Sequence, residues 1–421
     1  MTRLTAVADD LTGANGLGGR WAGRGAAVCV ARRVDWLRTE AGCRILDAET
    51  RLLGPGAARA QVQAAWTALG GSGLRFQKID STLRGNPGAE IEGLMLATSA
   101  PWVAVLPAYP ALGRQVLDSA VWVHGKRLDR TEYFRDPLSP AKVWRPRDLF
   151  PAALVAHAPL KAVAGGAGSL GTWLRRALAS GPRFVTFDCA EEAQVQVIAD
   201  ACLAHGCRHF AGAADLGGAL AARILGPAKA AQRPRGLPWM VLAGSVSATT
   251  FGQLQAWREA GRLWEPRLSR PDRGARDRAR GRWRIVPARF SPLLRKRLLR
   301  DGGLALSSLA GREDLAPWCL AQAKRGRAVT RSAEDAMAAL ARWGLSVSGG
   351  LGPCGYFVTG GHTLRALDDA AGFRRFHIVG EVLPEVPLGR AEGPQGWAWL
   401  CSKPGGFGAR DCFVRFMEVG A

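Results

Sequence analysis

Residues 74–90 read "LRFQKIDSTLRGNPGAE", a short run rich in apolar side chains that gives way to a dense polar turn and then to a proline. The first six residues have the length and composition of a β-strand. Proline is favoured at the first position of a helix, so a helix is expected to begin near Pro87. The segment therefore predicts a strand, a polar turn and a helix in succession.

The same succession recurs through the first half of the chain. Helical periodicity separates short apolar runs. The predicted strands are 3–8, 26–31, 43–48, 74–79, 102–108, 183–189 and 208–213, and the predicted helices lie near 14–24, 56–69, 88–98, 168–180 and 191–205. This alternation is typical of a mostly parallel α/β sheet.

The second half of the chain repeats the alternation after a break. The pattern loosens over 214–238 and ends in "GPAKAAQRPRGLP", which reads as a linker near residue 230. The later strands are expected at 239–245, 355–361, 375–381 and 396–402. We predict two α/β domains, residues 1–225 and 236–421, each with a mostly parallel sheet flanked by helices.

Composition limits the class of protein. The 421 residues are 48% hydrophobic and 22% charged, as in soluble globular proteins. No apolar run approaches the roughly 18 residues that span a bilayer, and Asp9 and Asp10 interrupt the N-terminal segment. We expect a cytoplasmic protein without a membrane partner. Nine cysteines without a CxxC pair indicate reduced thiols rather than a metal centre.

The net charge of +22 raises the question of a nucleic-acid partner. Only eight of the 57 basic residues are lysines, which resembles a coding bias toward arginine. The basic residues are scattered except in two stretches, 270–284 and 295–300. A solvated charged surface is therefore favoured and no nucleic-acid partner is predicted. A steep salt dependence of retention on DNA or RNA would indicate the alternative.

Polar turns follow three of the first four predicted strands. They contain Asp9, Asp10 and Thr12, then residues 47–51, then residues 80–86. The carboxyl ends of parallel strands share one edge, where ligands of open α/β sheets bind. Arginine, hydroxyl and carboxylate groups there suit a small polyhydroxy acid. The alternative is local: Asp80 and Ser81 cap the next helix, and Arg84 pairs with Asp80 or Glu90.

Glycine-rich turns follow three strands of the second half, at 244–253, 359–363 and 403–408. Glycine lets backbone amides approach an anion, and a helix N-terminus adds partial positive charge, so such turns cradle phosphates. None is a Walker A loop, and each alone could be no more than a tight turn. Three in one domain favour a nucleotide.

Eight motifs in order resemble the four-carbon acid sugar kinase family. They are "ADDLTGAN" (8–15), "KIDSTLRGNPGAE" (78–90), "PAYPALGR" (107–114), "TEYFRDPLSP" (131–140), "GSVSATTFGQ" (244–253), "TGGHT" (359–363), "GEVLPEVPLG" (380–389) and "KPGGFGARD" (403–411). The resemblance runs nearly end to end. It implies an ATP- and Mg²⁺-dependent kinase acting on the terminal hydroxyl of threonate, erythronate or a 3-oxo-tetronate.

The resemblance also implies a separate role for each domain. The N-terminal domain would bind the sugar acid, the C-terminal domain ATP, and the active site would lie in the cleft between them. A homodimer is compatible with the resemblance.

The family's functional residues are carried over by motif. Residues implied at the substrate are Asp9, Asp10, Arg51, Lys78, Asp80, Ser81, Thr82, Leu83, Arg84 and Asn86. Residues implied at the nucleotide are Ser245, Ser247, Gly360, Gly361, His362, Thr363, Lys403, Pro404, Gly405 and Gly406. Asp9 or Asp10 would be the base, and Arg84 with Lys78 or Arg51 would hold the substrate carboxylate. No protein ligand of a metal is assigned.

Two positions depart from the family pattern. Gly16 follows "GAN" where an acidic residue is usual, and His362 replaces the usual carboxylate of the family's "GGDT". An alternative to the kinase rests on these two departures: a relative that binds nucleotide or sugar acid without transferring phosphate.

Overall fold

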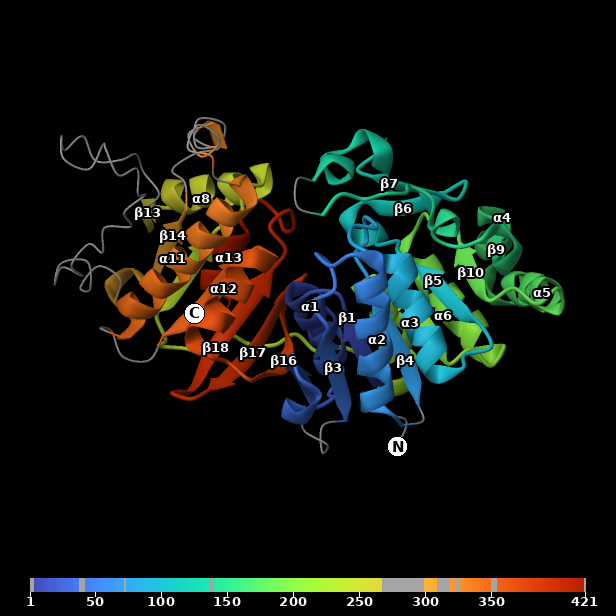
Figure 1. Ribbon diagram of the computed structural model, residues 1–421. Helices are drawn as coiled ribbons and strands as arrows, with labels where there is room; N and C mark the ends of the chain where they lie inside the picture. Colours follow the sequence, from blue (N-terminus) through green and yellow to red (C-terminus); the bar gives the residue numbers. More distant parts are fainter. Residues whose placement is uncertain are drawn as a thin grey trace. The chain divides into compact units, whose positions relative to one another are not determined.

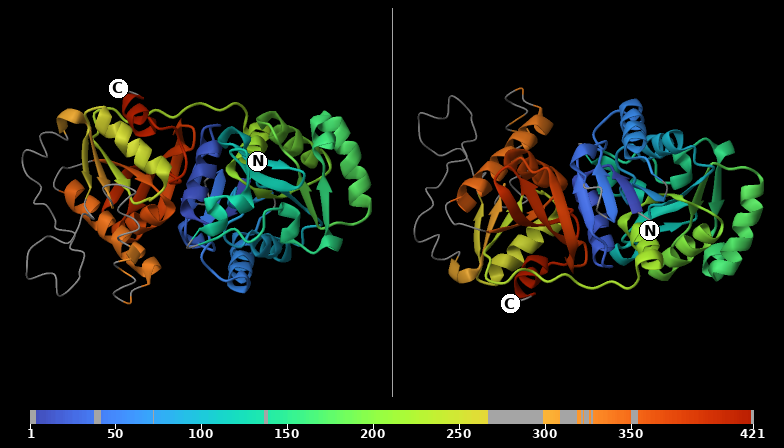
Figure 2. Two further views of the ribbon diagram at one scale, coloured as in Figure 1. Left: turned by 90° about the horizontal axis from the view of Figure 1, so that it is seen from above. Right: turned by 90° about the horizontal axis from the view of Figure 1, so that it is seen from below.

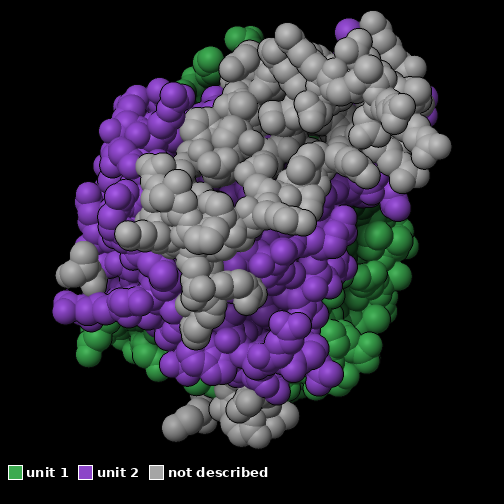
Figure 3. Space-filling view, turned by 90° about the vertical axis from the view of Figure 1, so that its left-hand side faces the viewer, with its two compact units in different colours: residues 1–229 green, residues 230–421 purple. Residues whose placement is uncertain are grey.

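The computed structural model describes residues 4–37, 42–71, 73–136, 139–266, 299–308, 319–320, 322, 326, 328–349 and 354–419 (Figure 1). The basic stretch 270–284 lies outside these residues. The chain divides into two compact units, residues 1–229 and 230–421, which are coloured separately in Figure 3. Each unit has its own α/β layers and is described by itself.

Unit 1 is built on a wholly parallel sheet in the order β2-β3-β1-β4-β11-β5-β10-β9. The strands are β1 (Leu4–Ala8), β2 (Val28–Ala31), β3 (Cys43–Asp47), β4 (Leu74–Lys78), β5 (Val103–Leu106), β9 (Val155–Ala158), β10 (Phe184–Phe187) and β11 (His209–Gly212). Most of the strands are buried along their whole length, as expected for a parallel sheet covered on both faces.

Helices cover both faces of this sheet (Figure 2). They are α1 (Leu11–Ala22), α2 (Pro55–Leu69), α3 (Pro87–Thr98), α4 (Leu160–Ala164), α5 (Gly166–Ala179), α6 (Glu192–Ala204) and α7 (Ala214–Leu225). Helices α2 and α3 pack together, and α1, α7, α6 and α5 form a second row. Gly93 allows the close approach of α3 to α2, because a Cβ there would lie 2.6 Å from the carbonyl oxygen of Arg59.

A small antiparallel sheet lies between β5 and β9 in the chain. Its strands are β6 (Arg114–Leu117), β7 (Ala120–Val123) and β8 (Lys126–Arg127). The sequence pattern did not predict this small sheet. An isolated bridge joins Arg84 to Ala141, so the segment after this sheet touches the polar turn that follows β4.

Unit 2 has a mixed sheet in the order β13-β14-β12-β15-β18-β17-β16. The strands are β12 (Trp239–Ala243), β13 (Leu263–Pro266), β14 (Gly303–Ser307), β15 (Gly355–Thr359), β16 (Arg375–Leu383), β17 (Val386–Gly393) and β18 (Gly396–Lys403). Pairing is parallel from β13 to β18 and antiparallel from β18 through β17 to β16. The mostly parallel α/β prediction is confirmed for both units.

The helices of unit 2 also pack in pairs, α11 (Val329–Gly349) with α12 (Gly361–Ala371) and α8 (Ala248–Glu259) with α13 (Cys412–Glu418). Aromatic rings fill the core between the sheet and α13. Phe357 packs edge-on against Phe413 and Phe416, with ring centroids 5.1 and 4.7 Å apart, and Trp239 packs against Phe416 at 4.8 Å. This core fixes β15 and β12, whose carboxyl ends carry two of the glycine-rich turns.

Some expected boundaries are wrong. Helix α7 occupies 214–225, where the pattern was expected to loosen toward the linker. Helix α1 begins at Leu11 rather than near residue 13 or 14, because the Asp10 side chain caps it by accepting a hydrogen bond from the Gly13 amide.

Candidate active site

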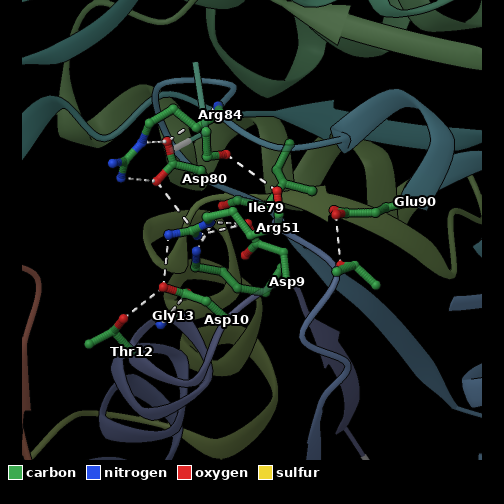
Figure 4. A network of polar contacts seen from close by, with 12 residues as sticks. Asp9, Asp10, Thr12, Gly13, Arg51, Ile79, Asp80, Arg84 and Glu90 are labelled. Atoms are coloured by element: carbon green, nitrogen blue, oxygen red, sulfur yellow. Dashed lines mark hydrogen bonds and ion pairs between the residues drawn. The ribbon is translucent and has the colours of Figure 1, made fainter. Parts of the chain in front are cut away.

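Two consecutive aspartates, Asp9 and Asp10, lie between the end of β1 and the start of α1 (Figure 4). Asp10 is the N-cap of α1, and its carboxylate accepts from the Gly13 amide at 2.8 Å and from the Thr12 hydroxyl at 2.7 Å. The side chain of Asp9 is 1% exposed and that of Asp10 is 19% exposed. Asp10 is therefore the more accessible of the two.

Arg51 joins both aspartates from the turn after β3. Its Nε donates to Asp9 at 2.8 Å and its Nη1 donates to Asp10 at 2.8 Å. Its Nη2 lies 2.7 Å from Asp9 and 3.7 Å from Asp80. Burial opposes the charge of Arg51, but the three carboxylates raise its pKa well above the ordinary value. Arg51 thus holds three strand-end turns together as a permanent cation.

The same contacts separate the pKa values of the two aspartates. Burial raises the pKa of Asp9 above its ordinary value, although Arg51 opposes this. Burial acts likewise on Asp10, but Arg51, Lys78 and the hydrogen bonds from Thr12 and Gly13 outweigh it and lower its pKa. Asp10 is therefore ionised at neutral pH.

Asp80 and Arg84 form a bidentate pair in the turn after β4. Arg84 Nε and Nη2 each donate to the Asp80 carboxylate at 2.9 Å. Arg84 Nη1 donates to Asp136 at 3.2 Å, and the guanidinium lies 5.3 Å from the centre of the Tyr133 ring. Burial opposes ionisation of Asp80, but Arg84 and Arg51 hold its pKa well below the usual range.

The local alternative for this turn is half right. Arg84 does pair with Asp80, and the pairing with Glu90 is absent among the described residues. Asp80 does not cap α3. The N-cap of α3 is Asn86, which makes no side-chain capping bond. Asn86 instead donates to the carbonyl oxygens of Thr50 and Leu53, at 3.1 and 2.7 Å, and so ties the turn after β3 to α3.

The remaining predicted substrate residues lie in or beside the same turn. Lys78 is buried at the end of β4, and its Nζ donates to the carbonyl oxygen of Ile79 at 2.7 Å. A Cβ at Gly13 would lie 3.0 Å from that Nζ, so Lys78 reaches the start of α1. Ser81 and Thr82 are buried, and Leu83 adopts a φ of 56°, which is rare for leucine.

Sequence reasoning placed Thr50 in the polar turn after β3 and named Glu90 only as a possible partner of Arg84, so it assigned neither residue to the substrate. Thr50 is fully buried and donates to Glu90 at 2.8 Å. Burial, together with the charge of Asp9, raises the pKa of Glu90 to about 8. Both residues lie within or beside the polar turns, but an acidic residue in a helix is usually solvent-exposed, so its burial has no sequence signal.

In unit 2, the three glycine-rich turns meet at Ser245. They follow β12, β15 and β18, which are parallel neighbours. A Cβ at Gly360 would lie 3.3 Å from the Cβ of Ser245, and a Cβ at Gly405 would lie 2.0 Å from its Oγ. Gly360 also has a φ of 98°, which disfavours any residue with a side chain. Each glycine therefore allows close backbone approach.

Hydrogen bonds lock the first and third turns together. Ser247 is the N-cap of α8 and accepts from the Thr250 amide at 3.1 Å. The hydroxyls of Ser247 and Thr250 donate to the Gly405 carbonyl oxygen at 2.7 and 2.9 Å. Gln253 donates to the carbonyl oxygens of residues 407–409, at 2.9–3.1 Å. Pro404 and Gly406 lie in the turn that these bonds hold.

The second turn opens α12. Gly361, His362 and Thr363 form its first turn, with His362 exposed and Thr363 buried. The amide of Gly360 donates to the carbonyl oxygen of Lys403 at 2.9 Å. The N-termini of α8 and α12 therefore begin at neighbouring strand ends, which suits an anion.

Lys403 ends β18 with its side chain turned inward. Its Nζ donates to the Thr359 hydroxyl at 2.9 Å, and the residue is 1% exposed. Burial lowers the pKa of Lys403 to about 8. A phosphate placed beside it would raise that pKa again.

The structure thus brings the ten predicted substrate residues to one edge of unit 1 and the ten predicted nucleotide residues to one edge of unit 2. Their roles toward ligands stay predictions. Among the described residues, no group of three or more His, Cys, Asp and Glu side chains could hold a metal ion. No helix in that part of the chain is long and apolar enough to cross a membrane.

Comparisons with known proteins match both units. A family model described as a sugar-binding N-terminal domain matches residues 4–222, and one described as a nucleotide-binding C-terminal domain matches residues 240–413. A protein of Salmonella typhimurium LT2 with a crystal structure shares the fold, with a TM-score of 0.76, 22% identity, and 99% of this chain and 98% of that chain covered.

Curated relatives carry the names of sugar-acid kinases. A D-threonate kinase of Salmonella typhimurium is 31% identical over 267 residues, and the match spans 60% of each protein. A D-threonate kinase of Cupriavidus necator is 30% identical over 91% of this chain and 89% of its own length. A D-erythronate kinase of Heliobacterium modesticaldum is 29% identical over 93% and 91%. With both family models and these relatives matched, the chain belongs to the four-carbon acid sugar kinase family.

Proposed function

We propose that this chain transfers the γ-phosphoryl group of ATP, bound with Mg²⁺, to the terminal hydroxyl of a four-carbon sugar acid. D-threonate and D-erythronate are the first candidates, because relatives that match about nine-tenths of the chain carry those names. The acid would bind unit 1 and the nucleotide unit 2.

The observation that carries the proposal is the glycine cradle of unit 2. This cradle consists of three turns that follow adjacent parallel strands and meet at Ser245. Helices α8 and α12 begin in these turns, and the buried amine of Lys403 donates to the Thr359 hydroxyl. Backbone amides, helix N-termini and a lysine are the groups that hold polyphosphates. Mg²⁺ would arrive as part of the nucleotide substrate.

The acid site of unit 1 supplies the complementary chemistry. Asp10 is ionised, is the more exposed aspartate, and is held in place by Thr12, Gly13 and Arg51. We assign it as the base that takes the proton of the attacking hydroxyl. Asp9 is buried and would fix Arg51 rather than touch the acid.

Arg84 is the proposed partner of the substrate carboxylate. Its Nε and Nη2 are committed to Asp80, whereas Nη1 is held by Asp136 at 3.2 Å. A carboxylate could replace Asp136 on Nη1 without breaking the pair with Asp80. Binding of the acid would then break the bond between Arg84 and Asp136.

The chemical step is an in-line displacement. The hydroxyl oxygen forms a bond to the γ-phosphorus, the bond from that phosphorus to the bridging oxygen breaks, and ADP leaves. The hydroxyl proton passes to Asp10. Such transfer depends mainly on positioning and charge stabilisation, so Arg51, Arg84 and Lys403 contribute by holding both anions in place.

The test is ADP formation with Mg²⁺ and a panel of D- and L-threonate, D- and L-erythronate and their 3-oxo forms. Asp10→Asn should lower turnover by about 10²- to 10⁴-fold, the usual contribution of a general base. Asp35→Asn, at an exposed aspartate paired with Arg33, is the matched control and should keep full activity. Nucleotide binding without turnover on any acid would instead support a binding protein, as His362 and Gly16 suggest.

A further inference from the structure

Glu90 is a buried acid for which the proposed reaction has no use. It lies in the first turn of α3, and the residue is 1% exposed. Thr50 donates the one hydrogen bond that its carboxyl receives from the described residues, at 2.8 Å. A buried carboxylate normally needs several donors or a cation.

Among the described residues, no cation forms an ion pair with Glu90, although Arg51 and Lys78 lie near enough to favour its charged form. Asp9 faces it from the end of β1, Arg51 from the turn after β3, and Lys78 from β4. Arg51 is engaged by Asp9, Asp10 and Asp80. On α2, the helix packed against α3, Arg59 pairs with Glu92 instead.

The charge balance also opposes ionisation of Glu90. The Oδ1 atom of Asp9 is buried and has no hydrogen-bond partner among the described residues. Asp10 and Asp80 add two further carboxylates to the cluster that shares Arg51. The first turn of α3 favours an anion, but burial and Asp9 prevail and raise the pKa of Glu90 to about 8.

Thr50 and Arg51 are consecutive, so the residue that bonds to Glu90 is joined directly to Arg51 by the backbone. The Arg51 amide donates to the Asp9 carbonyl oxygen at 3.3 Å, and Asn86 holds the Thr50 carbonyl oxygen at 3.1 Å. The hydrogen bond from the Thr50 hydroxyl to the Glu90 carboxyl is a second link between this turn and α3 (Figure 4).

We propose that Glu90 is a positioning residue that keeps its proton at neutral pH and, through Thr50, holds Arg51 against Asp9 and Asp10. This inference rests on the proposed function, in which Arg51, Asp9 and Asp10 belong to the sugar-acid site. A second charge beside Asp9 would compete for Arg51 and repel an anionic acid. Acid binding is therefore expected to weaken as Glu90 ionises.

The first experiment needs no activity. The unfolding midpoint of the wild type, Glu90→Gln and the matched control Glu92→Gln is measured from pH 5 to pH 9. The native state holds the Glu90 proton more tightly than the unfolded state, so the wild type should lose stability relative to Glu90→Gln as pH rises from 4.5 to about 8. Glu92→Gln should run parallel to the wild type. A constant difference between Glu90→Gln and the wild type would overturn the proposal.

The second experiment measures binding of D-threonate and of D-erythronate by calorimetry over the same range. Lys403, whose pKa is also about 8, belongs to the nucleotide turns and does not enter this measurement. The affinity of the wild type for the acid should fall as pH rises through about 8, and Glu90→Gln should remove this pH dependence. Thr50→Ser keeps the hydroxyl and should show the same pH dependence as the wild type. Thr50→Val removes the hydroxyl and should weaken binding at every pH. An unchanged pH profile in Glu90→Gln would contradict the proposal. If neither acid binds the wild type, the assigned substrate is wrong, and the stability series still decides the state of Glu90.

Discussion

Gly405→Ala tests the nucleotide cradle at its tightest point. The new Cβ would lie 2.0 Å from the Oγ and 2.6 Å from the Cβ of Ser245. Rotation of Ser245 could move its Oγ, but its Cβ is fixed to the backbone. The turn after β18 must therefore move away from the turn after β12.

The size of the effect follows from the contacts of Gly405. Its carbonyl oxygen accepts from Ser247 and Thr250, at 2.7 and 2.9 Å. Each bond contributes about 0.5–1.5 kcal/mol, so their loss costs about 1–3 kcal/mol. If the nucleotide requires the intact turn, its affinity should fall by about 5- to 150-fold, at tenfold for each 1.4 kcal/mol.

Calorimetric titration with ATP and Mg²⁺ measures this loss, and Gly252→Ala is the matched control. Gly252 lies in α8, and the nearest atom to its added Cβ would be Arg410 Cγ at 4.0 Å. That variant should bind ATP as the wild type does and gain about 0.5–1 kcal/mol of stability. Adding Ser245→Gly to Gly405→Ala removes both clashing atoms, so the unfolding midpoints of the two single variants and the double variant should be non-additive. Undiminished ATP affinity in Gly405→Ala would refute the assignment of the cradle.

Two further predictions concern buried charges. Arg51→Met should cost about 3–5 kcal/mol of stability at neutral pH, because buried Asp9 loses its ion-pair partner. In urea unfolding the loss should be smaller at pH 5, where Asp9 protonates more readily. An equal loss at both pH values would argue against this cause. The pKa of Lys403 in the folded protein is about 8, below its usual 10.5. The wild type should therefore gain stability relative to Lys403→Met as pH rises between those values, on the order of 3 kcal/mol at most. A pH-independent difference would show that burial does not lower this pKa.

The strand-end turns could be predicted because parallel pairing leaves little choice. In the observed register Ala8 pairs with both Asp47 and Lys78, so the turns after β1, β3 and β4 begin side by side. The same holds for β12, β15 and β18 in unit 2. The hydrophobic runs of the sequence were therefore enough to predict that most of the candidate site lies at two sheet edges.

Side-chain partners could not be predicted, because they depend on contacts between distant segments. Arg84 reaches Asp136, 52 residues away, and the amine of Lys403 turns inward to Thr359. Helix α7 was not predicted because its sequence, "ADLGGALAARIL", contains two consecutive glycines, which disfavour a helix. Strand β17 was not predicted: it contains Pro387 and Gly389, which are unusual within strands, yet it pairs with a strand on each side.

The most direct test of the central claim follows the phosphorus itself. Phosphorus NMR of the protein with ATP, Mg²⁺ and each four-carbon acid in turn distinguishes a phosphate ester from free phosphate. The account predicts a new ester signal with at least one acid, formed in step with ADP and lost in Asp10→Asn. ATP that stays intact, or that yields only free phosphate with every acid, would contradict it.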